Sequence, residues 1–528
     1  MDDHTNEAFT TVAGVIRAQA RIRGDRAAVR CDGNEQTFDE LDRRSNQVAA
    51  ALLAAGVQPQ ERVAFLDKNG PEYFEVLYGA AKVNAVTVGV NWRLAPAELA
   101  FVIDDCEARV LVVGPELAAV ADELRPQLPR LEQVIVIGAD DERDYDRWLA
   151  PHVGAADPAV PSAPGDVAMQ VYTSGTTGQP KGAMLTNESF SFLVPRVGEA
   201  WRFGPDSVNL VVMPLFHVSG GGWALVGMHR GALAILQREV VPADILRAIE
   251  VERVTVAALV ISVVQFLMMD PACASTDFSS LELIAYGGSP PPREAMLRAV
   301  ETFGCDFVQL YGMTEACGAV CALPPEDHDP DGPNAQRLLS CGKPYPWVEL
   351  RVVDPESGDE VPVGETGEIC VRSPQVMLGY WRQPEETAAV LDADGWFHTG
   401  DAGKVDEDGY VYLLDRVKDM IISGGENVYP AEVENVLMDH PGIADVALIG
   451  VPDERWGETP KALVIAAEGH DPDDALAKDI ISFSRDRLAH YKCPTSVDYV
   501  AALPRNAAGK VLKRDLRAPF WAGRDRRI

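Results

Sequence analysis

The sequence has little positive charge for its length. Its 528 residues include 47 lysines and arginines against 80 aspartates and glutamates, which gives a formal net charge of −33 at pH 7. An acidic surface of this kind repels polyanions, so nucleic acid and anionic lipid headgroups are excluded as general partners. A site for a charged nucleotide therefore has to gather its few cations locally.

Paired cysteines are also missing. The nine cysteines are scattered and odd in number, without a Cys-x-x-Cys pair, so a disulfide framework and a structural zinc site are both disfavoured. Cys317 and Cys321 lie near each other, but no histidine pair follows at metal-ligand spacing, and we expect them to be small core residues. This cysteine usage fits a reducing compartment.

No segment has the pattern of a secretion signal or a membrane span. The first residues, Met1-Asp2-Asp3-His4, are acidic and lack the apolar region of a signal peptide. The longest apolar run, Val254 to Met269, is too short to cross a bilayer and predicts a buried strand that leads into a core helix. We expect a cytoplasmic monomer or homodimer without a transmembrane segment, in at most transient peripheral contact with membranes.

The most informative stretch that is present is residues 172–184, Tyr-Thr-Ser-Gly-Thr-Thr-Gly-Gln-Pro-Lys-Gly-Ala-Met. Small residues let backbone N–H groups approach an anion closely, and the hydroxyls and the lysine add further donors. The Walker A spacing is absent, so this is a different kind of phosphate loop from that of the P-loop enzymes. The alternative is an ordinary surface loop rich in serine, threonine and glycine. We predict a polyphosphate-binding loop built from Thr173, Ser174, Gly175, Thr176, Thr177 and Lys181.

Hydrophobic patterning predicts an α/β fold. From Phe38 onward, helical and strand patterns alternate, which is typical of parallel sheets covered on both faces. Between Val348 and Leu413 short strands broken by turns predict a β-rich subdomain, and after Arg416 a compact α+β module follows. We therefore predict a large N-terminal domain of doubly wound αβ layers with a β-rich subdomain (1–415), a hinge (416–418) and a small mobile C-terminal α+β domain (419–528).

Four further clusters accompany the loop. They are Tyr311-Gly-Met-Thr-Glu315 after a predicted strand, Thr399-Gly-Asp401 on a glycine turn, the charged junction from Asp415 to Asn427, and Pro504 to Lys510 on a glycine-containing loop. Each has an ordinary explanation by itself, as a strand edge, a turn or a surface lysine. Their occurrence together and in this order is what points to a nucleotide-dependent enzyme.

In these motifs the chain resembles the adenylate-forming superfamily, which includes acyl-CoA synthetases, luciferases and the adenylation domains of peptide synthetases. The resemblance covers about residues 10–520, and its most specific parts are residues 394–401 and 415–430. Within the superfamily the chain is most similar to fatty-acyl-CoA synthetases and 4-coumarate-CoA ligases of actinobacterial type.

The resemblance implies a role for each matching residue. Tyr311 would stack on adenine, Asp401 and Arg416 would bind the ribose hydroxyls, and Thr314 would lie near the α-phosphate. The implied catalytic residues are Lys510, which bridges the substrate carboxylate and the α-phosphate, the magnesium ligand Glu315, and Thr173 and His217. The remaining implied adenine-site residues are Gly288, Ser289, Gln309 and Gly312.

The resemblance also implies the reaction. A carboxylic acid attacks the α-phosphorus of ATP with Mg²⁺, pyrophosphate leaves, and the thiol of CoA then takes the acyl group from the adenylate and releases AMP. The C-terminal domain is expected to rotate about Lys418 between these half-reactions, as in other hinged enzymes. Ser423, Gly424 and Gly425 would lie beside the pantetheine of CoA.

One departure from the peptide-synthetase pattern bears on the acid. Those adenylation domains carry an aspartate for the substrate's amino group, whereas this chain has Met213-Pro-Leu-Phe-His217-Val-Ser219 without a carboxylate. We therefore expect a plain carboxylic acid, long-chain or bulky because glycines follow Ser219, with His217 as an aromatic gate or alternatively as a packed core residue. Val260 and Met313 would complete an uncharged acyl pocket with His217, Ser219 and Gly221.

An aryl-acid CoA ligase stays open as an alternative. A mono-oxygenating or acyl-AMP-transferring relative, including a ligase that loads a carrier protein, is a second alternative. Fatty-acyl-AMP ligases of that kind carry an extra insertion near the hinge domain, and the short spacing in this chain disfavours them. A catalytically dead adenylate sensor is disfavoured because Lys510, Glu315, Asp401 and Arg416 are all present.

Overall fold

A computed structural model describes residues 9–173, 180–287, 293–329, 332–423, 426–453, 455–505 and 511–522, with the backbone alone at 293, 294, 418, 426 and 427. The chain forms two compact units. The first comprises Met1–Leu338, Tyr345–Val348 and Arg372–Phe397, and the second comprises Leu339–Pro344, Glu349–Val371 and His398–Ile528. Most of the predicted β-rich subdomain thus belongs to the same unit as the C-terminal module, and the predicted domain boundary at 415 stays a prediction.

The first unit contains a sheet whose centre is parallel. Its strand order is β18-β8-β7-β4-β3-β5-β6, in which β7, β4, β3, β5 and β6 run parallel, and β8 and β18 are antiparallel additions at one edge. The strands are β3 (Arg62–Leu66), β4 (Val86–Gly89), β5 (Ala108–Val113), β6 (Gln133–Val136), β7 (Val167–Thr173), β8 (Lys181–Thr186) and β18 (Gly379–Tyr380). The parallel strands predicted from apolar runs are confirmed.

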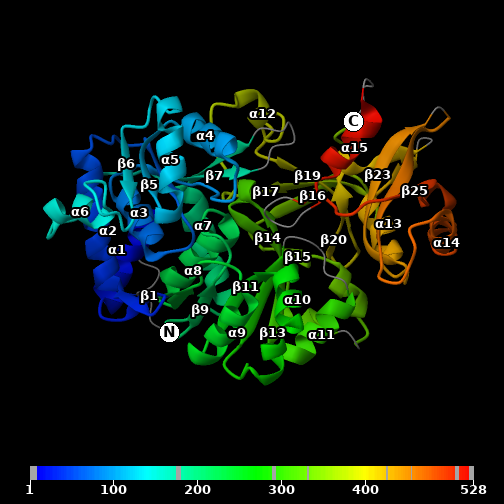
Figure 1. Ribbon diagram of the computed structural model, residues 1–528, viewed down its shortest axis with the longest axis horizontal. Coiled ribbons are helices and arrows are strands. Elements are labelled where there is room, and N and C mark those ends of the chain that lie inside the picture. Colours follow the sequence, from blue (N-terminus) through cyan, green and yellow to red (C-terminus); the bar gives the residue numbers. More distant parts are fainter. Residues whose placement is uncertain are drawn as a thin grey trace. The chain divides into compact units, whose positions relative to one another are not determined.

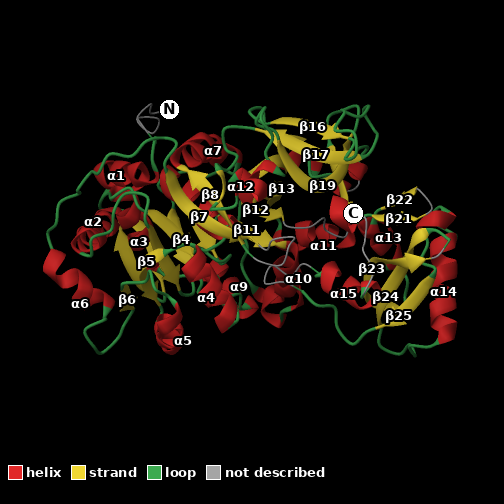
Figure 2. Ribbon diagram, turned by 90° about the horizontal axis from the view of Figure 1, so that it is seen from above, coloured by secondary structure: helices red, strands yellow, loops and turns green. Residues whose placement is uncertain are grey.

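Helices cover both faces of this sheet (Figure 2). Leucines and valines of α4 (Pro96–Asp105) and α5 (Ala118–Leu124) share a core with β3, β4 and β5 on one face. On the other face α1 (Val12–Arg23), α2 (Phe38–Ala54) and α3 (Pro71–Lys82) pack together, with α6 (Tyr145–Leu149) against α2. A capping box between Thr37 and Glu40 begins α2, and Pro71 begins α3 at the position where a missing N–H costs nothing.

A second sheet follows the order β14-β13-β12-β11-β9-β10-β1-β2, with parallel strands in the middle and antiparallel ones at these two ends. Helices lie beside its strands (Figure 1), and the predicted strand and helix between Val254 and Met269 are confirmed as β11 and α10. The strands are β1 (Ala27–Cys31), β2 (Asn34–Thr37), β9 (Val208–Val211), β10 (Leu233–Leu236), β11 (Val256–Val260), β12 (Leu283–Gly287), β13 (Asp306–Met313) and β14 (Gly318–Leu323), and the helices are α7 (Asn187–Ala200), α8 (Trp223–Arg230), α9 (Pro242–Val251), α10 (Ile261–Met269) and α11 (Arg293–Phe303).

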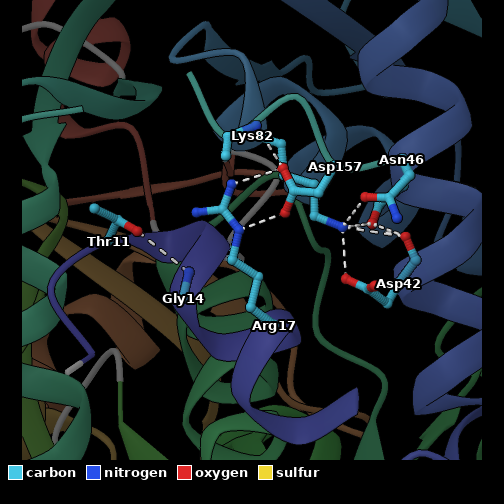
Figure 3. A network of polar contacts seen from close by, with 9 residues as sticks. Thr11, Gly14, Arg17, Asp42, Asn46, Lys82 and Asp157 are labelled. Carbon is cyan, nitrogen blue, oxygen red and sulfur yellow. Dashed lines mark hydrogen bonds and ion pairs between the residues drawn. The ribbon is translucent and has the colours of Figure 1, made fainter. Parts of the chain in front are cut away.

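Ion pairs fix the helices of the first unit (Figure 3). Lys82, at the end of α3, has no exposed side-chain surface, and its Nζ donates to Asp42 Oδ1 at 2.6 Å and to Ser45 Oγ and Asn46 Oδ1 at 2.7 Å. These acceptors all lie on α2, so the ammonium group ties the two helices together. The guanidinium of Arg17 on α1 holds Asp157 with two hydrogen bonds and so ties α1 to the segment between α6 and β7.

The second unit contains two smaller sheets. The sheet β16-β17-β19-β20 confirms the predicted β-rich character, and the C-terminal module pairs β22-β21-β24-β23 with β25 parallel to β24. Apolar residues of α13 and α14 cover one face of that module, and α15 packs on the other. The elements are β16 (Glu349–Val353), β17 (Gly367–Arg372), β19 (Phe397–Val405), β20 (Val411–Arg416), β21 (Ile421–Ser423), β22 (Glu426–Val428), β23 (Ile443–Asp453), β24 (Gly457–Ala466), β25 (Ser496–Tyr499), α13 (Pro430–Leu437), α14 (Asp474–Arg485) and α15 (Lys513–Trp521), with β15 (Lys343–Pro344) in this unit and α12 (Pro384–Ala388) in the first.

None of the nine cysteines is in a disulfide. Cys317 and Cys321 are buried, which confirms that they are small core residues. In the parts of the chain that the structure describes, no helix combines the length and the apolar character needed to span a bilayer.

Candidate adenylate-forming site

The predicted phosphate loop connects two paired strands. β7 ends at Thr173 and β8 begins at Lys181, and these two residues are direct partners in the antiparallel pair. Ser174, Gly175, Thr176 and Thr177 lie outside the described residues. The loop therefore starts at the carboxyl end of a parallel strand, which is the edge where open α/β sheets bind ligands.

Glu315 reaches the start of this loop. It lies in a short 3₁₀ turn (Thr314–Ala316) directly after β13, and its Oε1 accepts hydrogen bonds from Thr173 Oγ1 at 3.4 Å and from the Tyr380 hydroxyl at 2.9 Å. The structure thus brings together two residues that the sequence analysis predicted and adds a third that it missed. A carboxylate with two hydroxyls offers the oxygen ligands that Mg²⁺ prefers.

A strap made of residues 377–387 carries Tyr380 to this place. The Met377 N–H donates to the Glu315 carbonyl oxygen at 2.7 Å, and the Trp381 N–H donates to the Gly182 carbonyl oxygen at 2.8 Å. Between them β18 pairs with β8, where Tyr380 lies opposite Ala183. The strap therefore joins the strand that leaves the phosphate loop to the turn that holds Glu315.

The same strap supplies a counterion for the loop lysine. The side chain of Lys181 is only 7% exposed, forms an ion pair with Glu386 on α12, and lies 5.1 Å from the centre of the Tyr380 ring. An unpaired ammonium group is costly in a buried position. The carboxylate of Glu386 therefore neutralises the charge of Lys181, which a bound polyphosphate would otherwise neutralise.

The predicted adenine side of the site lies on β13. Gln309 and Tyr311 are both buried, and because they are two positions apart on one strand they share a face of the sheet. Gln309 Oε1 accepts a hydrogen bond from the Tyr286 hydroxyl at 3.4 Å. A Cβ on Gly312 would lie 1.9 Å from the Gly318 carbonyl oxygen, so glycine is required there by the neighbouring strand β14. Gly288 and Ser289 lie outside the described residues.

The second unit pairs the two residues predicted to bind ribose. Asp401 and Arg416 are direct partners of β19 and β20, and the Arg416 Nε lies 2.7 Å from Asp401 Oδ1. The prediction of a glycine turn at Thr399-Gly-Asp401 is wrong, because these residues lie inside the strand β19. Gly400, which precedes Asp401 in this strand, has a φ of +69°, which a glycine adopts without strain.

Around the predicted hinge, the described side chains form a buried ion cluster. The Lys513 ammonium lies 3.3 Å from Asp415 Oδ2 and 3.0 Å from Glu434 Oε1, and Arg517 pairs with Asp419 at 3.0 Å. The two carboxylates raise the pKa of Lys513 against the opposing effect of burial. Lys418 lies in a 3₁₀ turn (Val417–Asp419), Ser423 is buried at the end of β21, and Gly424, Gly425 and Lys510 lie outside the described residues.

His217 precedes a π-helical turn, Val218–Gly222, in the first unit. Burial, with a smaller effect of Arg93, lowers its pKa to about 4, so the imidazole is neutral at pH 7. Asn69 fixes the preceding loop, because its Oδ1 accepts from the Leu215 N–H at 2.9 Å and its Nδ2 donates to the Met213 carbonyl oxygen at 3.1 Å.

Two of the three glycines after Ser219 pack against backbone, whereas a Cβ on Gly222 would meet nothing closer than Val218 Cβ at 3.9 Å. A Cβ on Gly220 would lie 2.3 Å from the Pro214 carbonyl oxygen, and one on Gly221 would lie 2.7 Å from that of Leu215. Gly220 and Gly221 therefore do not support a large acyl group, and the size of the acid and the predicted pocket residues stay predictions. Val260 and Met313 are the last residues of β11 and β13, so they lie at the same edge of the second sheet.

Comparison with known proteins identifies the family. The model of the AMP-binding enzyme family matches residues 16–381, and that of the AMP-binding enzyme C-terminal domain matches residues 432–510. This chain belongs to the AMP-binding enzyme family. Among its relatives are a feruloyl-CoA synthase of Amycolatopsis sp (42% identical, covering 95% of this chain and 97% of the relative) and a fatty acid–[acyl-carrier-protein] ligase of Streptomyces coeruleorubidus (38%, covering 100% of both).

Solved structures agree with this family. The anthranilate CoA ligase AuaEII in complex with anthranoyl-AMP superimposes with a TM-score of 0.85 at 29% identity and covers 97% of both chains. The protein is thus an adenylate-forming ligase of the acyl-CoA and acyl-carrier-protein kind, an acid–thiol ligase, from a family that uses ATP, Mg²⁺ and CoA. Its mixed α/β architecture with a large N-terminal part and a smaller C-terminal part is confirmed.

In this AMP-binding enzyme, sequence reasoning missed Tyr380 and Glu386. Tyr380 is 65 positions from Glu315, and Glu386 is 205 positions from Lys181. The segment carries no glycine-rich or catalytic pattern, so the one available signal was a tyrosine and acidic residues between predicted strands, which is common on protein surfaces.

Proposed function

We propose that this AMP-binding enzyme is an AMP-forming ligase that joins a plain carboxylic acid with an apolar tail to CoA. The neutral His217 in a segment without a carboxylate carries this proposal. A substrate ammonium group would find no counterion in Met213–Ser219, and leaving such a charge unpaired in a buried pocket is costly. An uncharged acyl group meets no such penalty.

The described residues support the first half-reaction. Thr173 and Lys181 lie at the two ends of the phosphate loop, where a hydroxyl and an ammonium group would bind phosphate oxygens. Glu315 with Thr173 and Tyr380 would hold Mg²⁺, which when bound offsets the negative charge of the phosphates. Nucleotide binding would release Lys181 from Glu386, and Lys510 would approach the α-phosphate from the C-terminal module.

The proposed acid is long-chain or otherwise bulky. The apolar Val260 and Met313, at the carboxyl edge of the second sheet, support a pocket without charge. A relative supports a fatty acid: a long-chain-fatty-acid–CoA ligase of Mycobacterium tuberculosis is 36% identical over 92% of this chain. An aryl acid is the second candidate, because the feruloyl-CoA synthase is 42% identical over 95% of this chain.

Transfer to a carrier protein is a second candidate for the acceptor step. It is favoured by the full-length similarity to the Streptomyces fatty acid–[acyl-carrier-protein] ligase. CoA is the first choice because the chain shares more identity with the feruloyl-CoA synthase than with that ligase.

Two assays in series test the proposal. ATP–pyrophosphate exchange over fatty acids, hydroxycinnamates and amino acids measures activation alone, and we expect exchange with acids that lack an amino group. Thioester formation from the best acid, with CoA and a phosphopantetheinylated carrier protein compared, then identifies the acceptor. Exchange with amino acids only would refute the plain-acid proposal, and transfer to the carrier protein without transfer to CoA would refute the CoA proposal.

A further inference from the structure

Three potential metal ligands meet on the second unit's β-rich sheet, on two neighbouring strands. Glu368 and Cys370 belong to β17, and His398 belongs to β19, its neighbour in the sheet. The His398 Nδ1 lies 2.8 Å from Glu368 Oε2 and 3.4 Å from Cys370 Sγ, and all three ligand atoms lie within 4.8 Å of one another. We propose that Glu368, Cys370 and His398 form a binding site for a zinc-class divalent transition metal.

The sheet geometry explains why these atoms converge. Residues two positions apart on a strand project from the same face, so Glu368 and Cys370 point to one side of β17. His398 lies on the adjacent strand, at the distance from Glu368 and Cys370 that separates side chains of a cross-strand pair. The three side chains therefore meet because of the backbone, and no unusual side-chain conformation is needed.

The distances suit a small tetrahedral ion. With metal bonds of about 2.3 Å to sulfur and about 2.0–2.2 Å to nitrogen and oxygen, neighbouring ligand atoms of a tetrahedron lie roughly 3.3–3.6 Å apart. The observed sulfur–nitrogen distance of 3.4 Å already matches, and the nitrogen–oxygen pair needs to open from 2.8 Å by about half an ångström. Three protein ligands leave one position for water.

A second contact orients the carboxylate. Glu368 Oε1 accepts a hydrogen bond from the Gly400 N–H at 3.0 Å, so that Oε2 is the oxygen directed at His398. Hydrogen bonds of this kind to the distal oxygen are what commonly orient metal-bound carboxylates. The Thr399 hydroxyl, which donates to the Ile369 carbonyl oxygen at 2.7 Å, holds β19 beside β17 at the same point.

The ligand set selects the type of metal. Thiolate and imidazole favour zinc and its neighbours, whereas Mg²⁺ and Ca²⁺ prefer oxygen ligands only. On binding, a bond forms between the metal and the sulfur of Cys370, the S–H bond breaks, and the thiol proton passes to solvent. His398 binds as the neutral imidazole. The site is therefore chemically distinct from the magnesium ligands proposed around Glu315.

Cobalt titration of the full-length, reduced protein in excess Mg²⁺ tests the site, because a thiolate bound to Co²⁺ gives a charge-transfer band. We expect one band per chain, which Zn²⁺ removes by competition. Cys370→Ser and His398→Asn should each abolish this band and weaken zinc binding by more than ~100-fold. Loss of a residue that only orients a metal ligand already lowers metal affinity by about 10–100-fold. Cys493→Ser is the matched control, because that buried thiol of the same unit donates to main-chain oxygens of Leu488 and Ala489.

Each other outcome overturns the proposal. A wild-type protein without the band shows that Glu368 and His398 form only a hydrogen bond beside a thiol. A band that survives in Cys370→Ser, or that is lost in Cys493→Ser, assigns the metal to other cysteines. Circular dichroism of each variant, with Cys370→Ala as a second thiol variant, separates loss of the site from loss of folding.

Discussion

Removing the hydroxyl of Tyr380 tests the construction of the nucleotide site most directly. In Tyr380→Phe the ring that lies 5.1 Å from Lys181 is kept, and the change deletes the hydrogen bond that the hydroxyl donates to the Glu315 carboxylate. Glu315 then keeps the weaker bond from Thr173, at 3.4 Å. We expect the carboxylate to lose its fixed orientation toward the metal.

The contacts set the size of the effect. A hydrogen bond to a charged group contributes roughly 1.5–3 kcal/mol, and Tyr380 is buried, so solvent replaces the lost donor poorly. Because Thr173 still donates, we take the lower end, about 1.5 kcal/mol, which corresponds to a roughly tenfold loss of kcat/KM. The Mg²⁺ concentration that gives half-maximal activity should rise by a similar factor.

ATP–pyrophosphate exchange measured against ATP and against Mg²⁺ gives both quantities. Tyr499→Phe is the matched control, since its hydroxyl donates to the main-chain oxygen of Asp473 and should leave exchange unchanged. A Tyr380→Phe enzyme with wild-type Mg²⁺ dependence and less than a twofold loss of kcat/KM would refute the positioning of Glu315 by Tyr380.

The remaining predictions concern charges in the first unit. Glu386→Gln should lower KM for ATP about threefold. A carboxylate ~6 Å from a phosphate repels that phosphate by about 0.7 kcal/mol in a water-like dielectric, and the substitution removes this repulsion. An unchanged KM would mean that the Lys181–Glu386 ion pair does not compete with nucleotide binding. Lys82→Met should destabilise the protein by about 3 kcal/mol in urea unfolding, because it leaves the acceptors of Figure 3 unpaired; a shift below about 1 kcal/mol would contradict this. Burial lowers the pKa of His229 to about 4. Between pH 6.5 and 4 the unfolded chain therefore binds a proton that the folded chain does not, so the stability of the protein falls as the pH falls. His229→Phe should reduce the loss of unfolding free energy between these pH values by at most about 3 kcal/mol. Identical plots of unfolding free energy against pH for the wild type and the variant would refute the role of His229.

Much of the fold follows from local patterns in the sequence. The strand Arg62–Leu66 is a short apolar run with every residue buried, and the helix Pro430–Leu437 begins where proline fixes the first turn. Both follow from signals that act over a few residues, namely a short apolar run and a proline at a helix start. The predicted glycine turn at Thr399-Gly-Asp401 was wrong in form, because the positive φ of Gly400 bends a strand that continues through it.

Gly220 and Gly221 show where composition misleads. A glycine can make room for a ligand or for another piece of backbone, and the sequence is the same in both cases. At Gly220 the space is taken by backbone, because the Pro214 carbonyl oxygen lies 2.3 Å from where a Cβ on Gly220 would be. Such close approaches depend on the path of the chain several residues away.

The sequence by itself determined the family, the nucleotide-binding motifs and the order of most strands and helices, because these depend on residue type and short spacing. Only the tertiary structure decided that Tyr380 binds Glu315, that Glu386 neutralises Lys181, and that Glu368, Cys370 and His398 meet on one sheet. These contacts join positions up to 205 residues apart and arise from strand pairing, for which a single sequence carries no local signal.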